Sequence, residues 1–183
     1  MYLETIVDGG KRMQRLISDL LEYSRVGRMG NPRELTPLRQ PVDEALALLH
    51  SSIQESGAAV TIGALPDAWV DHAQMIRVFQ NLIGNAIKYR GDKVPDVRIQ
   101  AQESSDEWKI RVSDNGIGIS EEFSDQVFII FKRLHTRDEY AGTGIGLAIC
   151  KRIVERHGGS IRLIADRNEG STFEFTLPKR PPV

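Results

Sequence analysis

Apolar side chains recur at spacings of three and four along the first 26 residues, with charged side chains between them. This period predicts a long amphipathic helix over residues 3–26. The segment 27–32 is rich in glycine and ends in Asn-Pro, which predicts a stop and a linker. Because no earlier segment can cover the apolar stripe of this helix, we expect it to pair with another chain or with further sequence.

Beyond residue 32 the pattern changes between helical and strand periods. It predicts helices over residues 41–57, 73–89 and 145–157, a short further helix within 115–146, and strands over 34–39, 59–62, 68–70, 97–101, 108–112, 160–165 and 172–177. Asp71, with Gln74 three residues later, resembles a capping box for the helix 73–89. Because helices and strands do not alternate strictly, we expect an α+β sandwich, a mixed sheet with helices on one face.

Composition and charge indicate an ordinary folded chain. The 183 residues are 40% hydrophobic and 27% charged, and the net charge is −1 at pH 7. This balance gives no sign of a partner that is a nucleic acid or an anionic membrane.

No apolar run approaches the ~20 residues of a membrane span, and the start does not resemble a signal peptide. The single Cys150 cannot form an internal disulfide, so we expect a cytoplasmic chain, whether or not the parent protein is anchored in a membrane.

The predicted helix 73–89 carries the first chemical signal. Its polar stripe holds Arg77, Asn81, Asn85 and Lys88, opposite an apolar face. Asparagine is a weak helix former, so two asparagines on one face suggest a task beyond solvation. Amide oxygens suit Mg²⁺, and a lysine can neutralise phosphate oxygens. Spacing alone also fits an ordinary solvated helix face.

Two glycine-containing segments add to this stripe. Asp114 follows a predicted strand and precedes Asn-Gly-Ile-Gly at 115–118, where backbone can approach a ligand and the carboxylate can accept a hydrogen bond from an adenine amine. Residues 142–146 (Gly-Thr-Gly-Ile-Gly) lead into a helix, whose N–H groups and dipole suit phosphates. Each segment alone also fits a plain turn, and the second lacks the dinucleotide spacing. The charged stretch 131–140, with His135 and Arg137, fits a lid or a solvated loop.

Taken in order, these segments resemble the N, first glycine, F and second glycine boxes of sensor histidine kinases. The matching segments are residues 81–89 (Asn-Leu-Ile-Gly-Asn-Ala-Ile-Lys-Tyr), 114–118 (Asp-Asn-Gly-Ile-Gly), 128–134 (Phe-Ile-Ile-Phe-Lys-Arg-Leu) and 142–147 (Gly-Thr-Gly-Ile-Gly-Leu). Residues 131–140 and 151–159 are especially similar to phytochrome-like and related PAS-containing sensors.

The resemblance also implies a domain organisation. Residues 33–178 would form the catalytic domain, a Bergerat-type ATP-binding α/β sandwich shared with the gyrase, Hsp90 and MutL ATPases. Residues 1–27 resemble the second helix of the dimerisation and histidine-phosphotransfer bundle, which would be incomplete here. Residues 28–32 would then be a linker and 179–183 a tail.

Roles for single residues follow from the same resemblance. ATP would be bound by Asn85, Lys88, Tyr89, Asp114, Gly116, Gly118, Ile119, Arg133, Gly142, Thr143, Gly144, Gly146, Leu147 and Thr172. Asn85 would hold Mg²⁺, Asp114 would take the adenine amine, and Thr172 would support that contact through water. Phe128 and Phe131 would anchor the lid. Catalytic roles would fall to Arg133, Lys88 and Asn81.

The implied activity is transfer of the γ-phosphoryl group of ATP to a histidine, for relay to an aspartate of a response-regulator receiver domain. Further implied partners are a second copy, through the N-terminal helix of the intact protein, and an upstream sensor domain. The family's acceptor histidine lies in a His-Glu/Asp motif that no segment here matches. We expect a fragment without its own acceptor, in which the four histidines are structural or solvated: His50, His72, His135 and His157.

Three alternatives remain at this point. An ATP hydrolase or clamp of the same fold would use a glutamate one turn before the metal-binding asparagine. That position is Asn81, whose amide cannot take a proton, so hydrolysis should be slow. A serine kinase of the anti-sigma type would lack the N-terminal helix. A nucleotide-gated interaction module would recruit partner kinases without transferring phosphate.

Overall fold

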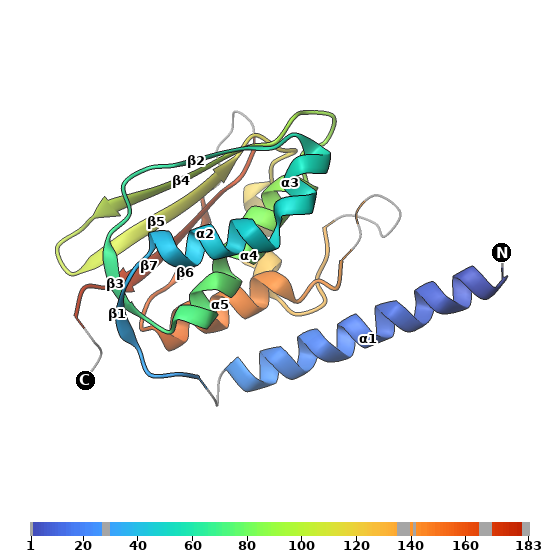
Figure 1. The fold of residues 1–183 in the computed structure, drawn as a ribbon, viewed down its shortest axis with the longest axis horizontal. Helices are drawn as coiled ribbons and strands as arrows, with labels where there is room; N and C mark the ends of the chain where they lie inside the picture. The colour runs from blue at the N-terminus through green and yellow to red at the C-terminus, as the bar shows by residue number, and fades with distance from the viewer. Residues whose placement is uncertain (1, 27–29, 135–139, 141, 165–169, 181–183) are drawn as a thin grey trace.

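The computed structural model describes residues 2–26, 30–134, 140, 142–164 and 170–180. Its helices are α1 (Tyr2–Val26), α2 (Arg39–Leu48), α3 (His50–Ser56), α4 (His72–Lys88) and α5 (Gly146–Arg156). Its strands are β1 (Glu34–Pro37), β2 (Ala59–Ile62), β3 (Asp67–Val70), β4 (Asp96–Glu103), β5 (Glu107–Asp114), β6 (Ile161–Ile164) and β7 (Thr172–Pro178). Helices α2, α4 and α5 lie over one face of the sheet, while α1 runs outside this unit (Figure 1).

Five strands form a mixed sheet in the order β2-β4-β5-β7-β6. The hairpins β4-β5 and β6-β7 form as the alternating pattern predicts. Strand β2 joins β4 in parallel, and β5 joins β7 antiparallel, so segments far apart in the sequence become neighbours. Strands β1 and β3 pair in a separate two-stranded sheet. The predicted fold class, a mixed sheet with helices on one face, is confirmed.

The core lies between the large sheet and helices α4 and α5. Alternate strand residues face it, because successive side chains of a strand point to opposite faces. The ring of Phe79 on α4 meets that of Phe175 on β7 edge-on, with 5.8 Å between the centroids. Ile149 and Ile153 of α5 are fully buried beside Cys150, and burial raises the pKa of the Cys150 thiol to about 12. The lone thiol is therefore a packing residue.

Helix α4 begins at the predicted cap. Oδ1 of Asp71 accepts a hydrogen bond from the backbone N–H of Gln74 at 3.2 Å. The side chain of Gln74 does not complete the box, because its Oε1 accepts from Arg156, while the N–H of Asp71 donates to Nε2 of His157 at 2.9 Å. Nδ1 of His157 lies 2.7 Å from the carbonyl of Ile153, and burial lowers the pKa of this histidine. His157 is thus a neutral structural residue, as predicted.

Two predicted elements differ from the structure in more than their exact ends. The helix expected over 41–57 begins earlier, at Arg39, and is interrupted at Leu49. Helix α2 has fully buried residues whereas α3 has none. The turn between them lets Leu49, and Ile53 of α3, pack partly buried against the core. The strand expected over 34–39 ends at Pro37, because the next residue caps α2.

Helix α1 packs along α5 with its C-terminal half (Figure 1). Val26 is buried, and Leu16 and Tyr23 pack against the core. The guanidinium carbon of Arg152 on α5 lies 4.7 Å from the centroid of the Tyr23 ring. A second apolar side of the helix stays about half exposed, at Val7, Met13, Ile17, Leu20 and Leu21. Among the described helices, none is both long and apolar enough to cross a membrane.

Candidate functional site

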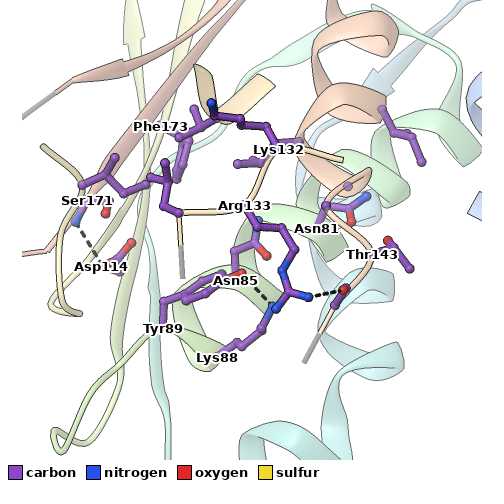
Figure 2. Close-up of a pocket in the computed structure, with 18 of the residues that line it drawn as sticks. Asn81, Asn85, Lys88, Tyr89, Asp114, Lys132, Arg133, Thr143, Ser171 and Phe173 are labelled. Carbon is purple, nitrogen blue, oxygen red and sulfur yellow. Dashed lines mark hydrogen bonds between the residues drawn. The ribbon is translucent and has the colours of Figure 1, made fainter. Parts of the chain in front are cut away.

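A cavity of about 230 Å³ lies between the sheet, helix α4 and the N-terminus of α5. Figure 2 shows the side chains that surround it. The predicted site residues that line it are Asn81, Asn85, Lys88, Tyr89, Asp114, Gly118, Ile119, Arg133, Gly142, Thr143, Gly144, Gly146 and Leu147. The fold therefore brings all four boxes to one place. Gly116 and Thr172 are the two predicted residues outside the lining.

At one end of the cavity, Asp114 terminates β5. Its Oδ1 accepts hydrogen bonds from the backbone N–H groups of Gly116 at 2.9 Å and Ser171 at 3.0 Å. Burial raises the pKa of Asp114, and the two hydrogen bonds oppose that rise only in part. A Cβ at position 116 would clash with the carbonyl oxygen of Tyr89, so only glycine fits there. Although it does not line the cavity, Gly116 holds Asp114 in place, so that Oδ2 remains to meet a ligand.

The start of β7 supplies two lining residues that the boxes did not predict: Ser171, directly before the strand, and Phe173 within it. Between them Thr172 points to the other face, where its Oγ1 donates to Oγ of Ser113 at 2.9 Å. Residues 171 and 173 share a face because strand side chains alternate. The period-two pattern of the predicted strand 172–177 was a signal that could have found Phe173, whereas Ser171 precedes that strand.

Helix α4 forms the long wall of the cavity. Nδ2 of Asn81 donates to the carbonyl of Arg77 at 3.0 Å, which fixes the amide. Its Oδ1 then faces the N-terminus of α5 so closely that a Cβ at Gly146 would lie 2.6 Å away. Any larger residue at 146 would displace the Asn81 amide from this position. One turn further along α4, Asn85 points into the middle of the cavity (Figure 2).

Lys88 and Tyr89 close the end of this wall. Nζ of Lys88 donates to the hydroxyl of Tyr89 at 2.7 Å and lies 4.2 Å from the ring centroid. The Tyr89 ring also contacts the ring of Tyr140, with centroids 4.8 Å apart. A cation and an aromatic surface therefore stand together at the cavity edge.

The segment between β5 and α5 covers the opposite side. The short helix predicted there is two three-residue 3₁₀ turns, Glu121–Phe123 and Gln126–Phe128. Phe128 is buried and meets the ring of Phe173, so it anchors this segment as predicted. Phe131 does not anchor it by burial, since its side chain is 57% exposed; its backbone N–H donates to the carbonyl of Gly144 at 3.0 Å. His135 and Arg137 lie outside the described residues.

Arg133 connects this segment to the glycine-rich loop. Its Nη1 donates to the carbonyl of Gly142 at 3.1 Å, and its Nη2 bonds the carbonyl of Tyr140. Both acceptors are backbone carbonyls, so these two bonds tie Arg133 to the chain at residues 140 and 142. The guanidinium lies beside the cavity, as Figure 2 shows.

Two further lining residues are Asp19 of α1 and Arg77 of α4. Oγ1 of Thr143 donates to Oδ2 of Asp19 at 2.6 Å, and Nη2 of Arg77 donates to Oε2 of Glu22 at 2.6 Å. Arg77 belongs to the polar stripe that the sequence predicts. The place of Asp19 follows only from the packing of α1 beside α5.

Comparison with known proteins adds independent information. A family model described as "Histidine kinase-, DNA gyrase B-, and HSP90-like ATPase" matches residues 70–181. The phytochrome-like protein Cph1 of Synechocystis sp. is 47% identical over 177 residues, which are 97% of this chain and 24% of that protein. The chain thus spans about a quarter of the length of this curated relative.

Solved structures agree with this match. The mycobacterial sensor histidine kinase MprB gives a TM-score of 0.69 at 25% identity and covers 82% of this chain and 99% of its own. Histidine kinase ThkA, in complex with the response regulator protein TrrA, gives a TM-score of 0.75 at 24% identity and covers 98% and 51%. At this identity, the similarity to ThkA shows a shared fold only.

Proposed function

This chain belongs to the family of histidine kinase-, DNA gyrase B- and HSP90-like ATPases, and we propose that it is the ATP-binding catalytic part of a sensor histidine kinase. The observation that carries the proposal is that Asp114, Asn85 and the glycine segment 142–146 converge on one cavity. These groups match the three parts of a nucleotide: base, metal-bound phosphates and phosphate tail.

The base would bind at the Asp114 end. A carboxylate oxygen there accepts a hydrogen bond from the exocyclic amine of adenine, which distinguishes adenine from guanine by its donor. Ile119 and Phe173 line the same end and supply apolar surface for a planar ring. Tyr89 would flank the base from the C-terminal end of α4. Thr172, whose hydroxyl bonds Ser113 on the other face of the sheet, does not reach this contact.

The phosphate tail would extend toward the N-terminus of α5. There the residues 142–147 carry backbone N–H groups at the positive end of a helix dipole, a natural seat for anionic oxygens. The ammonium group of Lys88 adds a positive charge from α4.

A magnesium ion would bind with the nucleotide. Within the described residues, no three or more His, Cys, Asp or Glu side chains form a cluster that could hold a metal. The amide oxygen of Asn85 is a hard, neutral donor in the middle of the cavity, and Mg²⁺ commonly takes its other ligands from phosphates and water. The residues present therefore fit Mg²⁺ carried by ATP, which would neutralise phosphate charge.

In the transfer step, a nitrogen of the acceptor histidine attacks the γ-phosphorus and the bond to the ADP oxygen breaks. The histidine loses a proton and becomes phosphorylated, while ADP leaves with the electron pair. Arg133 would stabilise charge on the transferring group, because its guanidinium lies at the cavity beside the glycine-rich segment. Asn81 would keep the site poor at hydrolysis, since an amide cannot act as general base toward water.

Partners follow from the same assignment. The exposed apolar side of α1 (Val7, Met13, Ile17, Leu20 and Leu21) supports pairing with a second copy in a helical bundle of the intact protein. A receiver domain of a response regulator would accept the phosphoryl group next, and an upstream sensor domain would control the kinase. The acceptor histidine would come from a bundle helix that this sequence does not supply. A protein that uses ATP and carries one buried thiol fits the cytoplasm.

Calorimetric titration with a non-hydrolysable ATP analogue tests the site. We expect binding that Mg²⁺ strengthens, and an Asn85→Ala variant that loses this gain, about tenfold in affinity, while still binding adenosine. Gln100→Ala removes an exposed amide on β4 and serves as the matched control.

Transfer of label from radioactive ATP to a separately supplied, histidine-bearing bundle then tests the kinase activity. Label on the bundle histidine supports the proposal. Rapid hydrolysis without transfer would instead indicate an ATPase, and a folded chain that binds no nucleotide would indicate an interaction module.

A further inference from the structure

We propose that docked α1 competes with the phosphate tail of the nucleotide for the same groups, so that helix docking and nucleotide binding weaken each other. This inference rests on the proposed function, because it concerns the regulation of that site. Its basis is that Asp19 of α1 lines the nucleotide cavity, although α1 lies outside the α/β unit that forms it.

The first shared group is Thr143, in the middle of the glycine-rich segment that would receive the phosphates. Its hydroxyl donates to Oδ2 of Asp19 at 2.6 Å. This bond holds the loop against α1 and uses the donor that a phosphate oxygen would need. It also places a carboxylate at the phosphate end of the cavity.

The second shared group is Arg77, one turn before Asn81 on α4. Its Nη2 donates to Oε2 of Glu22 at 2.6 Å and lies 3.9 Å from Oδ1 of Asp19. Its Nε is buried and has no hydrogen-bond partner among the described residues. The guanidinium, which lines the cavity, is thus held at Nη2 by carboxylates of α1 and at Nη1 by Oε1 of Gln80, while its Nε donor is unused among the described residues.

The charges explain why the two states exclude each other. A nucleotide triphosphate would bring several negative charges next to Asp19 and Glu22, whose side chains are only 24% and 31% exposed. Partial burial reduces screening by water and salt, so this repulsion is stronger than on an open surface. Removal of α1 would relieve the repulsion and release both Thr143 and Arg77 toward the phosphates.

The size of the cavity is consistent with this competition. Its volume of about 230 Å³ is below the roughly 300–1,000 Å³ of most small-molecule sites. One side is closed by the contact between Thr143 and Asp19, so withdrawal of α1 would enlarge the phosphate end.

Other contacts hold α1 without entering the cavity. Tyr23 packs on Arg152, and Val26 is buried against the domain. The helix can therefore be loosened by a change remote from the nucleotide. By linkage, any factor that loosens α1 must raise nucleotide affinity, and nucleotide must loosen α1 by the same factor.

Three variants test the competition in titrations with the ATP analogue and Mg²⁺. Asp19→Asn with Glu22→Gln removes the two carboxylates and should raise affinity about fivefold or more, within the usual range of coupled sites. Tyr23→Ala loosens α1 without changing a charge and should raise affinity in the same direction. Asp43→Asn with Glu44→Gln removes two carboxylates from the exposed face of α2 and should leave affinity within twofold.

Pulsed electron paramagnetic resonance gives the reciprocal measurement. Spin labels at Met13→Cys on α1 and Gln54→Cys on α3 occupy exposed positions, while buried Cys150 should not react. Nucleotide should broaden or shift the distance distribution of the otherwise unchanged chain. In the Asp19 and Glu22 variant the distribution should already be broad without nucleotide.

The outcomes separate the two proposals. If no form of the chain binds nucleotide, the proposed function fails and the competition with it. If all forms bind with equal affinity, only the competition is overturned. Weaker binding after removal of the carboxylates would make Asp19 a ligand-holding residue and also overturn it. If nucleotide affinity rises in the carboxylate variant but not in Tyr23→Ala, the effect comes from local charge alone. That result would overturn the role of helix docking.

Discussion

The two ends of the cavity are built in different ways. The Asp114 end is formed by β5 and β7, and its bonds run from backbone N–H groups of Gly116 and Ser171 to a half-buried carboxylate. The opposite end is formed by a loop, a helix terminus and α1, and its bonds join side chains such as Thr143 and Asp19. Under the proposed function, base recognition would be fixed by the sheet, whereas phosphate binding would depend on groups that can exchange partners.

The difference has a thermodynamic consequence. Strands β5 and β7 are in continuous register, with Ser113 opposite Thr172, so the Asp114 end loses little conformational freedom when a ligand binds. At the other end, Arg133 and Thr143 already bond to protein atoms that a ligand would have to replace. The Asp114 end would therefore give the base a constant affinity. The end formed by the glycine-rich loop and α1 would allow control of the transfer step.

The largest effect is expected at the movable end. Arg133→Ala should slow phosphoryl transfer to a supplied bundle about 100-fold or more, because a positive charge near the transferring group is lost. Affinity for the ATP analogue should change less than tenfold. Arg133→Lys keeps the charge without the planar fork and should recover part of the rate. Equal loss of binding and rate would show that Arg133 serves ground-state binding instead.

The next effect concerns the fixed end. Asp114→Ala should weaken adenosine binding by about 10- to 100-fold, the value of a hydrogen bond to a charged group. It also leaves two backbone N–H groups without their acceptor, so the free energy of unfolding should fall by about 1–3 kcal/mol in urea denaturation. Asp96→Ala, which removes a carboxylate paired only with Arg98 on β4 among the described residues, is the control for both measurements. Unchanged adenosine affinity would remove Asp114 from base recognition.

The smallest effect is a pH dependence confined to the fixed end. Burial raises the pKa of Asp114 above 3.8, so its carboxylate takes up a proton at a higher pH than an ordinary aspartate. Adenosine affinity should hold near neutral pH and fall severalfold as pH decreases through that raised value. Adenosine is the right probe because it carries no phosphate to titrate. Asp114→Asn should bind more weakly and without this dependence, and a dependence that persists in the variant would locate the titration elsewhere.

Local features of the sequence predicted the helices well. The start of α4 at Asp71 and the end of α5 before Gly158 follow from capping, which involves residues within four positions of one another. The break at Leu49 was missed, because it depends on how the two helices pack against the core. The reciprocal half of the Asp71 capping box was also missed, since His157 and Arg156 arrive from a helix more than 80 residues away.

By itself, the sequence determined the elements and the set of chemical groups, because periodicity, capping and glycine spacing act between near neighbours in the chain. Only the tertiary structure decided that β2 pairs with β4 and β5 with β7, that Ser171 and Phe173 line the cavity with Asp114, and that Asp19 reaches Thr143. Those contacts arise when distant segments bury a common apolar surface, and the identity of the partner segment is not written in the local pattern of either one.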